Sequence, residues 1–472
     1  MIDKREIIDT ATTLGLNPHV VEKDYVLGWL LWGIYNHDAL VESWIFKGGT
    51  CLKKCFFETY RFSEDLDFTL TDPGHINADF LKGVFAEIGE RIYEETGVEL
   101  PPDFQQFEIF QNPRGNPACQ GRIGYQGPVS PRGKSMPRVK LDLTADERVV
   151  LAPTELLAFH PYSDAPDDGI IVRAYAYEEA FGEKVRALAE RTRPRDLYDV
   201  INLFRNIDAR PAPAVLLDVL RQKCEFKGIR VPGLADLESH RADLEGGWAT
   251  MLEHQLPALP PLEAFWDVLP DFFAWLERGI MPVSPAAYIG AGDEELIRER
   301  TLRLPVSGTA QSYLEIIRFA ASNRLCVELQ YQDSTRRIEA YSLRRTRDDN
   351  IILHAHNLDK GEHRSYRVDR IQGARVTNQT FVPRFAIELT PTGPVAIAPT
   401  TTREISRPMQ SALRTRSSRR GGYSSGPTYI YECSACGKRF SRTRMTTTLN
   451  PHKDKSGYPC YGRYGYLVDT RY

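Results

Sequence analysis

The spacing of apolar and polar residues divides the chain into a mixed region, a helical region and a strand-rich region. The first 45 residues predict two helices, and the second, VVEKDYVLGWLLWGIY, is apolar on most faces and should be buried. Helical spacing returns between Ala78 and Thr96, whereas FQQFEIF, GRIGYQG and PRVKLDLT alternate as strands do. Further helices are predicted up to residue 300. The pattern therefore predicts an α/β (α+β) core followed by a helical lobe.

A second module begins near Gln311. The helix SYLEIIRFAASNRL is followed by four segments in which apolar and polar residues alternate: CVELQYQ, RRIEAYSLRR, NIILHAHN and RSYRVDRIQGARVT. A period of two is typical of strands that have one buried face. We therefore predict a small strand-rich domain after the helical lobe.

Beyond Pro394 the hydrophobic pattern is lost as far as Pro427. Residues 403–420 hold six Arg and one Glu among many Ser and Thr, which predicts a flexible basic linker. Such a linker can bind RNA through its phosphates without reading sequence, and a merely solvated tether is the alternative. We divide the chain into five segments: a core at 1–205, its helical lobe at 206–300, a strand-rich domain at 308–390, the linker at 394–427 and a tail at 428–472.

Composition limits the class of protein. With 60 Lys and Arg against 63 Asp and Glu, the formal net charge is −3, so any basic surface must be local. No run of 18 apolar residues is present, and the first ten residues, MIDKREIIDT, lack the apolar core of a signal peptide. The eight Cys are scattered, which is typical of a reducing compartment. We therefore expect a cytoplasmic protein with no membrane partner.

Residues 46–70, FKGGTCLKKCFFETYRFSEDLDFTL, combine residue types and spacing that demand chemistry. Gly48 and Gly49 precede Thr50 and a helix-like CLKKCFF, an arrangement in which backbone N–H groups can hold phosphates. Asp65 and Asp67 alternate with apolar residues in a short strand, so both carboxylates should point to one face. Paired carboxylates repel unless a cation such as Mg²⁺ or Mn²⁺ neutralises them. The alternative is a glycine turn beside an exposed acidic strand.

The string Lys47-Gly-Gly-Thr50, followed by Arg61-Phe-Ser-Glu-Asp-Leu-Asp67, resembles the AbiEii/AbiGii branch of the polymerase-β-like nucleotidyltransferase superfamily. This branch is the toxin half of type IV abortive-infection and toxin–antitoxin pairs. The resemblance implies a polymerase-β-like fold and Mg²⁺-dependent transfer of a nucleoside monophosphate from an NTP to an acceptor. It implies that Asp65 binds the metal together with Asp67. The residues expected at the NTP are Lys47, Gly48, Gly49, Thr50 and Ser63.

Two later stretches add candidate catalytic residues. In RVKLDLT, Asp142 shares a face with Lys140, and a third carboxylate would complete the metal site or take the proton from an attacking hydroxyl. A solvent-facing strand residue is the alternative. The family also carries a Lys on one helix and Arg-Asp-(Leu/Ile)-Tyr-Asp on the next. Mapped here, Lys184 would hold the triphosphate and Asp196 would orient it or assist the nucleophile, with Asp199 as the other candidate for that role. Surface salt bridges are the alternative there.

Resemblance to type IV toxins also suggests the acceptor and the partner. An RNA acceptor is implied, with tRNA 3′ ends as the best guess, and growth arrest during phage infection as the outcome. A separate antitoxin is expected, although regulation by the attached modules of the same chain is a competing arrangement. Two other hypotheses stay open. One is a nucleic-acid-binding regulator with an inactive nucleotidyltransferase core, and the other is a nucleotidyltransferase acting on a small molecule or a protein hydroxyl.

The strand-rich module resembles a WYL domain. The resemblance lies in the order of YSLR, a short strand and SYRVDRI, although Ile351-Ile352-Leu353 stands where the signature Trp-Tyr-Leu is expected. WYL domains are Sm-like β-barrels that bind nucleic acid or nucleotide ligands, and a purely structural barrel is the alternative. Guanidinium groups match phosphate oxygens. The contacts to test are Arg344, Arg345, His354, Arg367 and Arg370.

The tail carries four candidate zinc ligands. Cys433 and Cys436 form a CxxC knuckle followed by Gly437, and His452 and Cys460 complete the pattern C-x₂-C-x₁₅-H-x₇-C. Three thiolates and an imidazole suit tetrahedral Zn²⁺. The second pair is less regularly spaced, so His452 is the doubtful ligand. Because the tail has little core of its own, we expect Zn²⁺ to fold it. A CxxC without metal is the alternative.

Overall fold

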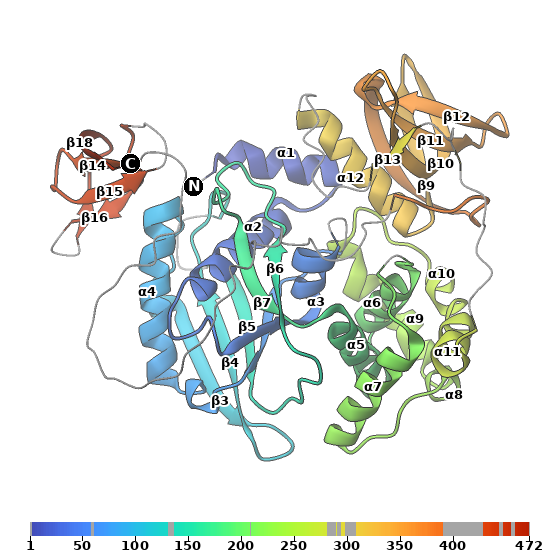
Figure 1. Cartoon of the computed structure of the whole chain (residues 1–472), viewed down its shortest axis with the longest axis horizontal. Coiled ribbons are helices and arrows are strands. Elements are labelled where there is room, and N and C mark those ends of the chain that lie inside the picture. Colours follow the sequence, from blue (N-terminus) through green and yellow to red (C-terminus); the bar gives the residue numbers. More distant parts are fainter. Residues whose placement is uncertain are drawn as a thin grey trace, which may run out of the picture.

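The chain folds into a core, a helical lobe, a β domain and a small tail, shown as a computed structural model in Figure 1. The structure describes residues 2–57, 61–130, 136–207, 209–280, 289, 294–297, 308–389, 428–442, 447–454 and 458–471. In these ranges, no helix combines the length and the apolar composition needed to cross a membrane. The α/β core, helical lobe, strand-rich domain and small tail predicted from the sequence are confirmed.

The core is built on a seven-stranded mixed sheet with the order β3-β4-β5-β2-β1-β7-β6. Strand β2 lies at its centre, antiparallel to β1 and parallel to β5. The strands are β1 (Trp44–Lys47), β2 (Asp65–Leu70), β3 (Gln105–Gln111), β4 (Pro117–Gly124), β5 (Arg138–Thr144), β6 (Thr154–Ala158) and β7 (Ile170–Ala174). The helices are α1 (Lys4–Leu14), α2 (Pro18–Tyr35), α3 (Gly48–Cys51), the π-helix η1 (Leu52–Phe56) and α4 (Ala78–Thr96).

The two faces of this sheet differ in chemistry. On one face Phe68 of β2 packs against Tyr35 of α2 and against Trp44, while Phe85 of α4 packs against Trp44. All four side chains are buried. Because side chains alternate along a strand, Asp67 lies on the opposite face. The helices α2 and α4 therefore cover one face, and the acidic residues of β2 lie on the other.

The helical lobe lies beside the core (Figure 1) and packs around α5 and α6. Phe204 of α6 contacts Phe272 and Trp275 of α11, and Phe181 of α5 stacks on the same two rings. These aromatic contacts hold α5 and α6 in fixed positions. The helices are α5 (Tyr177–Arg191), α6 (Pro194–Arg205), α7 (Pro213–Lys227), α8 (Leu234–Glu238), α9 (Arg241–Leu252), α10 (Glu263–Trp266) and α11 (Leu269–Arg278).

The β domain is an antiparallel sheet with the order β12-β11-β10-β9-β13, packed against α12 (Gly308–Ser322). Its strands are β8 (Glu295–Leu296), β9 (Leu325–Tyr331), β10 (Ser334–Arg345), β11 (Ile351–Asn357), β12 (Glu362–Arg367) and β13 (Ile371–Thr380). The segment RSYRVDRIQGARVT, expected as one strand, is divided into β12 and β13 by a 3₁₀ turn at Val368–Arg370. This turn separates two edge strands that pair with different neighbours.

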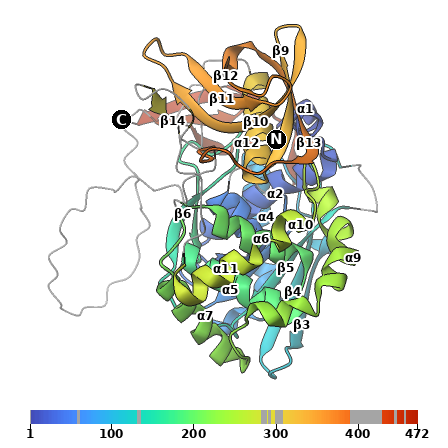
Figure 2. The same cartoon turned by 90° about the vertical axis from the view of Figure 1, so that its right-hand side faces the viewer.

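The β domain is joined to the core by packing, not by a tether alone. Helix α12 packs against α1, and Figure 2 shows the domain seated over the core and the helical lobe. Buried residues of α12 and β9, such as Ile317 and Val327, belong to the same apolar cluster as the buried residues of the core. Continuous burial of this kind limits independent motion of the domain.

The tail is a separate small unit against α4 (Figure 1). It consists of β14 (Thr428–Cys433), β15 (Arg439–Arg442), β16 (His452–Lys453), β17 (Pro459–Cys460) and β18 (Gly465–Arg471). Its own apolar cluster contains four buried residues: Tyr431, Cys433, Leu449 and Cys460. Two of these are candidate metal ligands, so the tail has little hydrophobic core that is independent of them.

Candidate active site

The turn at Gly48 and Gly49 connects β1 to α3 and is packed closely on both sides. Gly48 has φ +80°, which favours glycine, and a Cβ atom there would lie 2.0 Å from Asp67 Oδ2. A Cβ atom on Gly49 would lie 2.6 Å from Arg61 Nη2 and 3.0 Å from Ser63 Oγ. The bare backbone therefore touches Asp67 on one side and the Arg61–Ser63 strip on the other. Any side chain at either glycine would fill this space.

Four polar residues form one row across the sheet, on the face opposite α2 and α4. The strand register pairs Lys47 with Asp67, Asp67 with Asp142, and Asp142 with Gln120. Directly paired residues of neighbouring strands point to the same face. Asp65 lies two residues before Asp67 on this face. The structure thus brings together the three carboxylates that the sequence predicted at the site.

These carboxylates disturb one another's ionisation. Burial, followed by the negative charge of Asp142, raises the pKa of Asp67 to about 6, against the opposing charge of Lys47. Burial also raises the pKa of Asp65. Lys140 Nζ lies 2.6 Å from Asp142 Oδ2, and both side chains are more than a third exposed. A cluster of carboxylates that cannot all ionise comfortably is a suitable ligand set for a hard divalent cation.

The candidate residues of α5 and α6 lie in a buried ion-pair network. Lys184 Nζ is 2.7 Å from Asp199 Oδ2 and 3.4 Å from Asp196 Oδ1. Arg61 donates two hydrogen bonds of 2.8 Å to the two carboxylate oxygens of Asp199. Arg191 donates likewise to Asp196, at 2.7 and 2.9 Å. The surface salt bridges considered as an alternative are therefore absent here, because both aspartates are buried.

This network is electrostatically joined to the carboxylate row. The charge of Lys184 contributes to the pKa of Asp67 and opposes the upward shift. Burial alone would raise the pKa of Asp199, but the charges of Arg61 and Lys184 outweigh it and hold that pKa well below its usual range. Asp196 and Asp199 both bind Lys184, so the structure gives them a common partner instead of separating their roles.

Lys47 and Thr50 have structural partners of their own. Lys47 Nζ lies 3.4 Å from Glu183 Oε1 of α5 and 4.0 Å from Glu147 Oε1. The Thr50 hydroxyl donates a hydrogen bond to the carbonyl oxygen of Asp65. These contacts fasten the glycine turn to α5 and to the start of β2. Contact of Lys47 and Thr50 with an NTP stays a prediction, as it does for Ser63.

The continuation of the turn is anchored by a fully buried ion pair. Lys54 of η1 lies 2.8 Å from Asp24 of α2, which also accepts a hydrogen bond of 3.0 Å from Tyr162. The nearby Glu22 accepts hydrogen bonds from the backbone N–H groups of Val129 and Ser130. These acidic residues of α2 therefore support the scaffold that carries the Gly48 turn.

Sequence reasoning did not assign Arg61 to the site, and it did not assign Lys140 or Glu183 either. Arg61 stands at the start of the string that carries the family resemblance, so a cation before the acidic strand was an available signal. Lys140 shares the strand alternation with Asp142. Glu183 precedes Lys184, and only the packing of α5 against β1 reveals that it contacts Lys47.

In the β domain, the predicted ligand residues are mostly engaged in internal contacts. Arg344 pairs with Glu388 at 2.7 Å, Arg345 with Asp349 and Arg367 with Asp369. His354 is buried, with Nε2 2.8 Å from Glu294 and Nδ1 3.0 Å from His363. The register places Arg344, His354 and Arg367 on one face, because Ile352 pairs with both Arg344 and Arg367. Arg345 points to the other face, and Arg370 is exposed in the 3₁₀ turn. Ligand binding by these residues stays a prediction.

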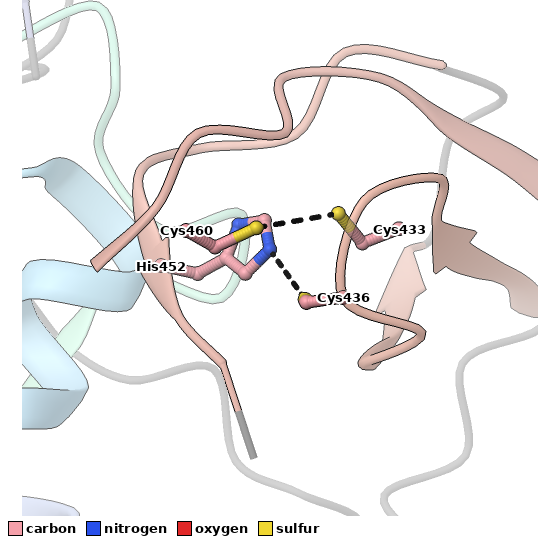
Figure 3. A group of neighbouring side chains, drawn as sticks. All are labelled: Cys433, Cys436, His452 and Cys460. Carbon is pink, nitrogen blue, oxygen red and sulfur yellow. Dashed lines mark hydrogen bonds between the residues drawn. The ribbon is translucent and has the colours of Figure 1, made fainter. Parts of the chain in front are cut away.

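The four candidate zinc ligands of the tail lie together (Figure 3), with their ligand atoms within 4.8 Å of one another. Cys433 Sγ is 3.8 Å from Cys460 Sγ, and Cys436 Sγ is 3.2 Å from His452 Nε2. His452 Nδ1 lies 2.9 Å from the Asn450 carbonyl oxygen, a contact that directs Nε2 toward the sulfurs. His452, the doubtful ligand from spacing, is thus part of the cluster, which can hold a zinc ion.

Comparison with known proteins identifies the class. The family model described as the nucleotidyl transferase AbiEii toxin of type IV toxin–antitoxin systems matches residues 29–278, more than half of the chain. The chain therefore belongs to the AbiEii nucleotidyltransferase toxin family. The WYL domain model matches residues 312–376, so the β domain is a WYL domain. Both resemblances predicted from the sequence are confirmed.

One solved structure to which the chain is similar is MenT4, a nucleotidyltransferase toxin from Mycobacterium tuberculosis H37Rv. The identity is 19%, the TM-score is 0.41, and the match covers 59% of this chain and 90% of that one. A comparison with curated proteins found no match.

Proposed function

We propose that this toxin-family protein transfers a nucleoside monophosphate from an NTP to a hydroxyl of RNA, with Mg²⁺ as cofactor and tRNA 3′ ends as the expected acceptor. One observation carries the proposal: Asp67 is paired with Asp142 across the sheet and is touched by the bare backbone of Gly48. Paired carboxylates beside a backbone that lacks side chains suit a metal-bound triphosphate.

The carboxylate row would hold the metal ions through Asp65, Asp67 and Asp142. When bound, Mg²⁺ neutralises phosphate charge and orients the triphosphate for in-line attack. The acceptor hydroxyl forms a bond to the α-phosphorus while the bond to the bridging oxygen breaks, and pyrophosphate leaves. Asp142 is the candidate for receiving the hydroxyl proton. It is 35% exposed and is therefore open to an incoming acceptor.

The cations beside the row would bind the triphosphate. Lys184 lies close enough to the row for its charge to act on Asp67, and its two aspartate partners hold it in place. We assign Asp196 and Asp199 the shared role of positioning Lys184. The backbone of the glycine turn, with Lys47, Thr50 and Ser63 around it, would complete the nucleotide site. The π-helix η1 extends α3, so the turn begins a continuous helical segment.

Two arrangements could restrain this activity. The family, whose members are toxins of type IV toxin–antitoxin systems, supports a separate antitoxin. The apolar packing of the WYL domain on the core favours restraint within the chain. Expression of the full chain without a partner separates them. Growth arrest that requires Asp65 and Asp67 indicates a separate antitoxin, and normal growth indicates restraint in cis.

We also propose that Zn²⁺ binds Cys433, Cys436, His452 and Cys460. The donor set and its clustering support this ion. A Cβ atom on Gly462 would lie 2.5 Å from Cys433 Sγ, so the chain closes tightly around the cluster. Little other core holds this unit together.

Label transfer tests the enzymatic proposal. The full chain is incubated with Mg²⁺ and each α-³²P NTP, with total tRNA, with protein extract or with no acceptor. We expect label on RNA, and the variant Asp65→Ala/Asp67→Ala should lower transfer by on the order of 10³-fold, because a metal site supplies several kcal/mol of transition-state stabilisation. The control Asp103→Ala removes an exposed carboxylate outside the row and should transfer normally. Label on protein instead of RNA, or transfer that survives loss of both aspartates, would contradict the proposal.

A further inference from the structure

Positive charge is concentrated at the end of the chain. Residues 394–472 hold 14 Lys and Arg against 4 Asp and Glu, whereas residues 1–393 hold 46 against 59. The nearly neutral total therefore conceals an acidic body and a strongly basic end. A basic segment attracts polyanions through release of their counterions, and an acidic body repels them. The charge complement of the end of the chain is thus a nucleic acid.

Exposed tyrosines gather in the same region. Tyr458, Tyr461, Tyr464 and Tyr466 are 71%, 92%, 68% and 52% exposed, whereas every other tyrosine in the described ranges is buried or half-buried. The four exposed rings are not needed for the small core of the tail, which is formed by other residues. Aromatic rings left on a surface in this number mark a contact site.

The metal cluster fixes where these rings stand. Tyr458 and Tyr461 flank the Pro459–Cys460 strand β17, and Cys460 is one of the four clustered ligands. Tyr464 and Tyr466 follow directly, at the start of β18, where the Tyr466 hydroxyl bonds to Glu432 at 2.9 Å. Every ring therefore lies within six residues of a ligand. A folded cluster presents four aromatic faces at defined positions.

The tail itself is held against the core by polar contacts with α4. Lys438 pairs with Glu94, Lys453 pairs with Glu90 at 3.0 Å, and Asn450 donates to the Glu95 carbonyl oxygen at 2.7 Å. Figure 1 shows the tail on the side of the core opposite the helical lobe. A ligand that reaches both the tail and the carboxylate row must therefore be long, which excludes a mononucleotide.

We propose that the tail is a stacking platform for single-stranded RNA. Bases stack on the exposed tyrosines, and the Lys and Arg residues of 394–472 hold the phosphates. Single strands are favoured because the bases of a duplex are already stacked on one another and leave no free faces. This inference rests on the proposed function in one respect, namely that RNA is the acceptor, and it assigns to the tail the task of holding that acceptor.

Fluorescence anisotropy with the zinc-loaded full chain tests the platform. The probe is a labelled single-stranded RNA of about 20 nucleotides, which exceeds one stacking site. Stacking contributes about 1–3 kcal/mol per base, so Tyr461→Ala/Tyr464→Ala should weaken binding by about 10-fold or more, while Tyr461→Phe/Tyr464→Phe retains it. Phe110→Ala removes an exposed ring of β3, 44% exposed, and serves as the matched control.

Three further readouts keep the result interpretable. The zinc content of each variant shows whether the tail is folded, and the single variant Tyr461→Ala, at a 92% exposed position, is available if the double variant loses zinc. Asp65→Ala/Asp67→Ala should bind the RNA normally, so that a failed transfer reaction and a failed platform are distinguishable. The platform is overturned if the alanine variants bind as tightly as the parent chain, or if duplex RNA of the same length binds equally well.

Discussion

The carboxylate row of the core and the Cys/His cluster of the tail are both ligand sets for cations, but they are held in place differently. Asp67 and Asp142 stand on central strands of a seven-stranded sheet, one face of which is covered by α2 and α4. Lys47 and Lys140 already lie beside them. The tail cluster has two small sheets and four buried apolar residues.

The difference predicts what each site loses with its cation. In the core, burial of apolar residues positions the ligands before any metal arrives, so metal removal abolishes chemistry and leaves the fold. In the tail, the ligands are themselves part of the core, so binding free energy is folding free energy. The core site is thus a preformed catalytic site, whereas the tail is folded by its ion.

The largest expected effect is on the tail. Removal of Zn²⁺ by a chelator, or by Cys436→Ser, should unfold residues 428–472, because structural zinc contributes about 10–16 kcal/mol to such units. Limited proteolysis read by mass spectrometry should show cleavage in the tail while the core stays protected. Ala435→Ser changes the neighbouring knuckle position without touching a ligand and should leave the tail protected. Equal resistance of the tail with and without zinc would contradict the comparison.

A smaller effect is expected in the ion-pair network of the core. Arg61→Met leaves the buried Asp199 with one cation fewer, and breaking a buried pair costs about 3–5 kcal/mol. Urea unfolding measures this loss. The control Arg337→Met breaks a half-exposed pair with Asp359 and should cost less than about 1 kcal/mol. The network is less important than we infer if the two variants lose the same stability.

The smallest effect concerns pH. The folded-state pKa of Asp67, about 6, lies above its ordinary value of 3.8, so between these values the folded chain binds more protons than the unfolded chain. Stability contributed by this group is therefore present at low pH and is lost as pH rises through about 6. Relative to the parent chain, Asp67→Asn should gain on the order of 1–2 kcal/mol of stability over this window.

Urea midpoints of the parent and Asp67→Asn chains, compared at several pH values without Mg²⁺, measure this gain. Added Mg²⁺ should flatten the slope of the parent chain, since the ion and the proton compete for the same carboxylate. If the two chains show parallel pH dependence, Asp67 does not carry the strain that its neighbours indicate.

Much of the candidate site could be predicted because its signals are local. Alternation along β2 and β5 shows which face Asp65, Asp67 and Asp142 occupy, and the glycines mark the turn. The partners of these residues could not be predicted. Arg61 reaches Asp199, and Lys47 reaches Glu183, across large separations in sequence. Such pairs depend on how α5 and α6 pack against the sheet.

In the WYL domain, the sequence singled out arginines by charge alone. Most of these arginines prove to have carboxylate partners nearby, such as Glu388 for Arg344 and Asp369 for Arg367. Charge shows which side chains can bind a phosphate, but only the surrounding structure shows which of them are already engaged. The exposed tyrosines of the tail are the opposite case, since their composition is evident in the sequence and their exposure is not.

The sequence by itself determined the ligand types, the glycine turn, the strand alternation and the membership of each module in its family. The tertiary structure decided that Asp142 lies beside Asp67, that Lys184 is shared by two buried aspartates, and that the tail stands against α4. The physical reason is the range of the interactions. Alternation and turn geometry arise from neighbouring residues, whereas strand order and helix packing follow from burial of apolar surface gathered from the whole chain.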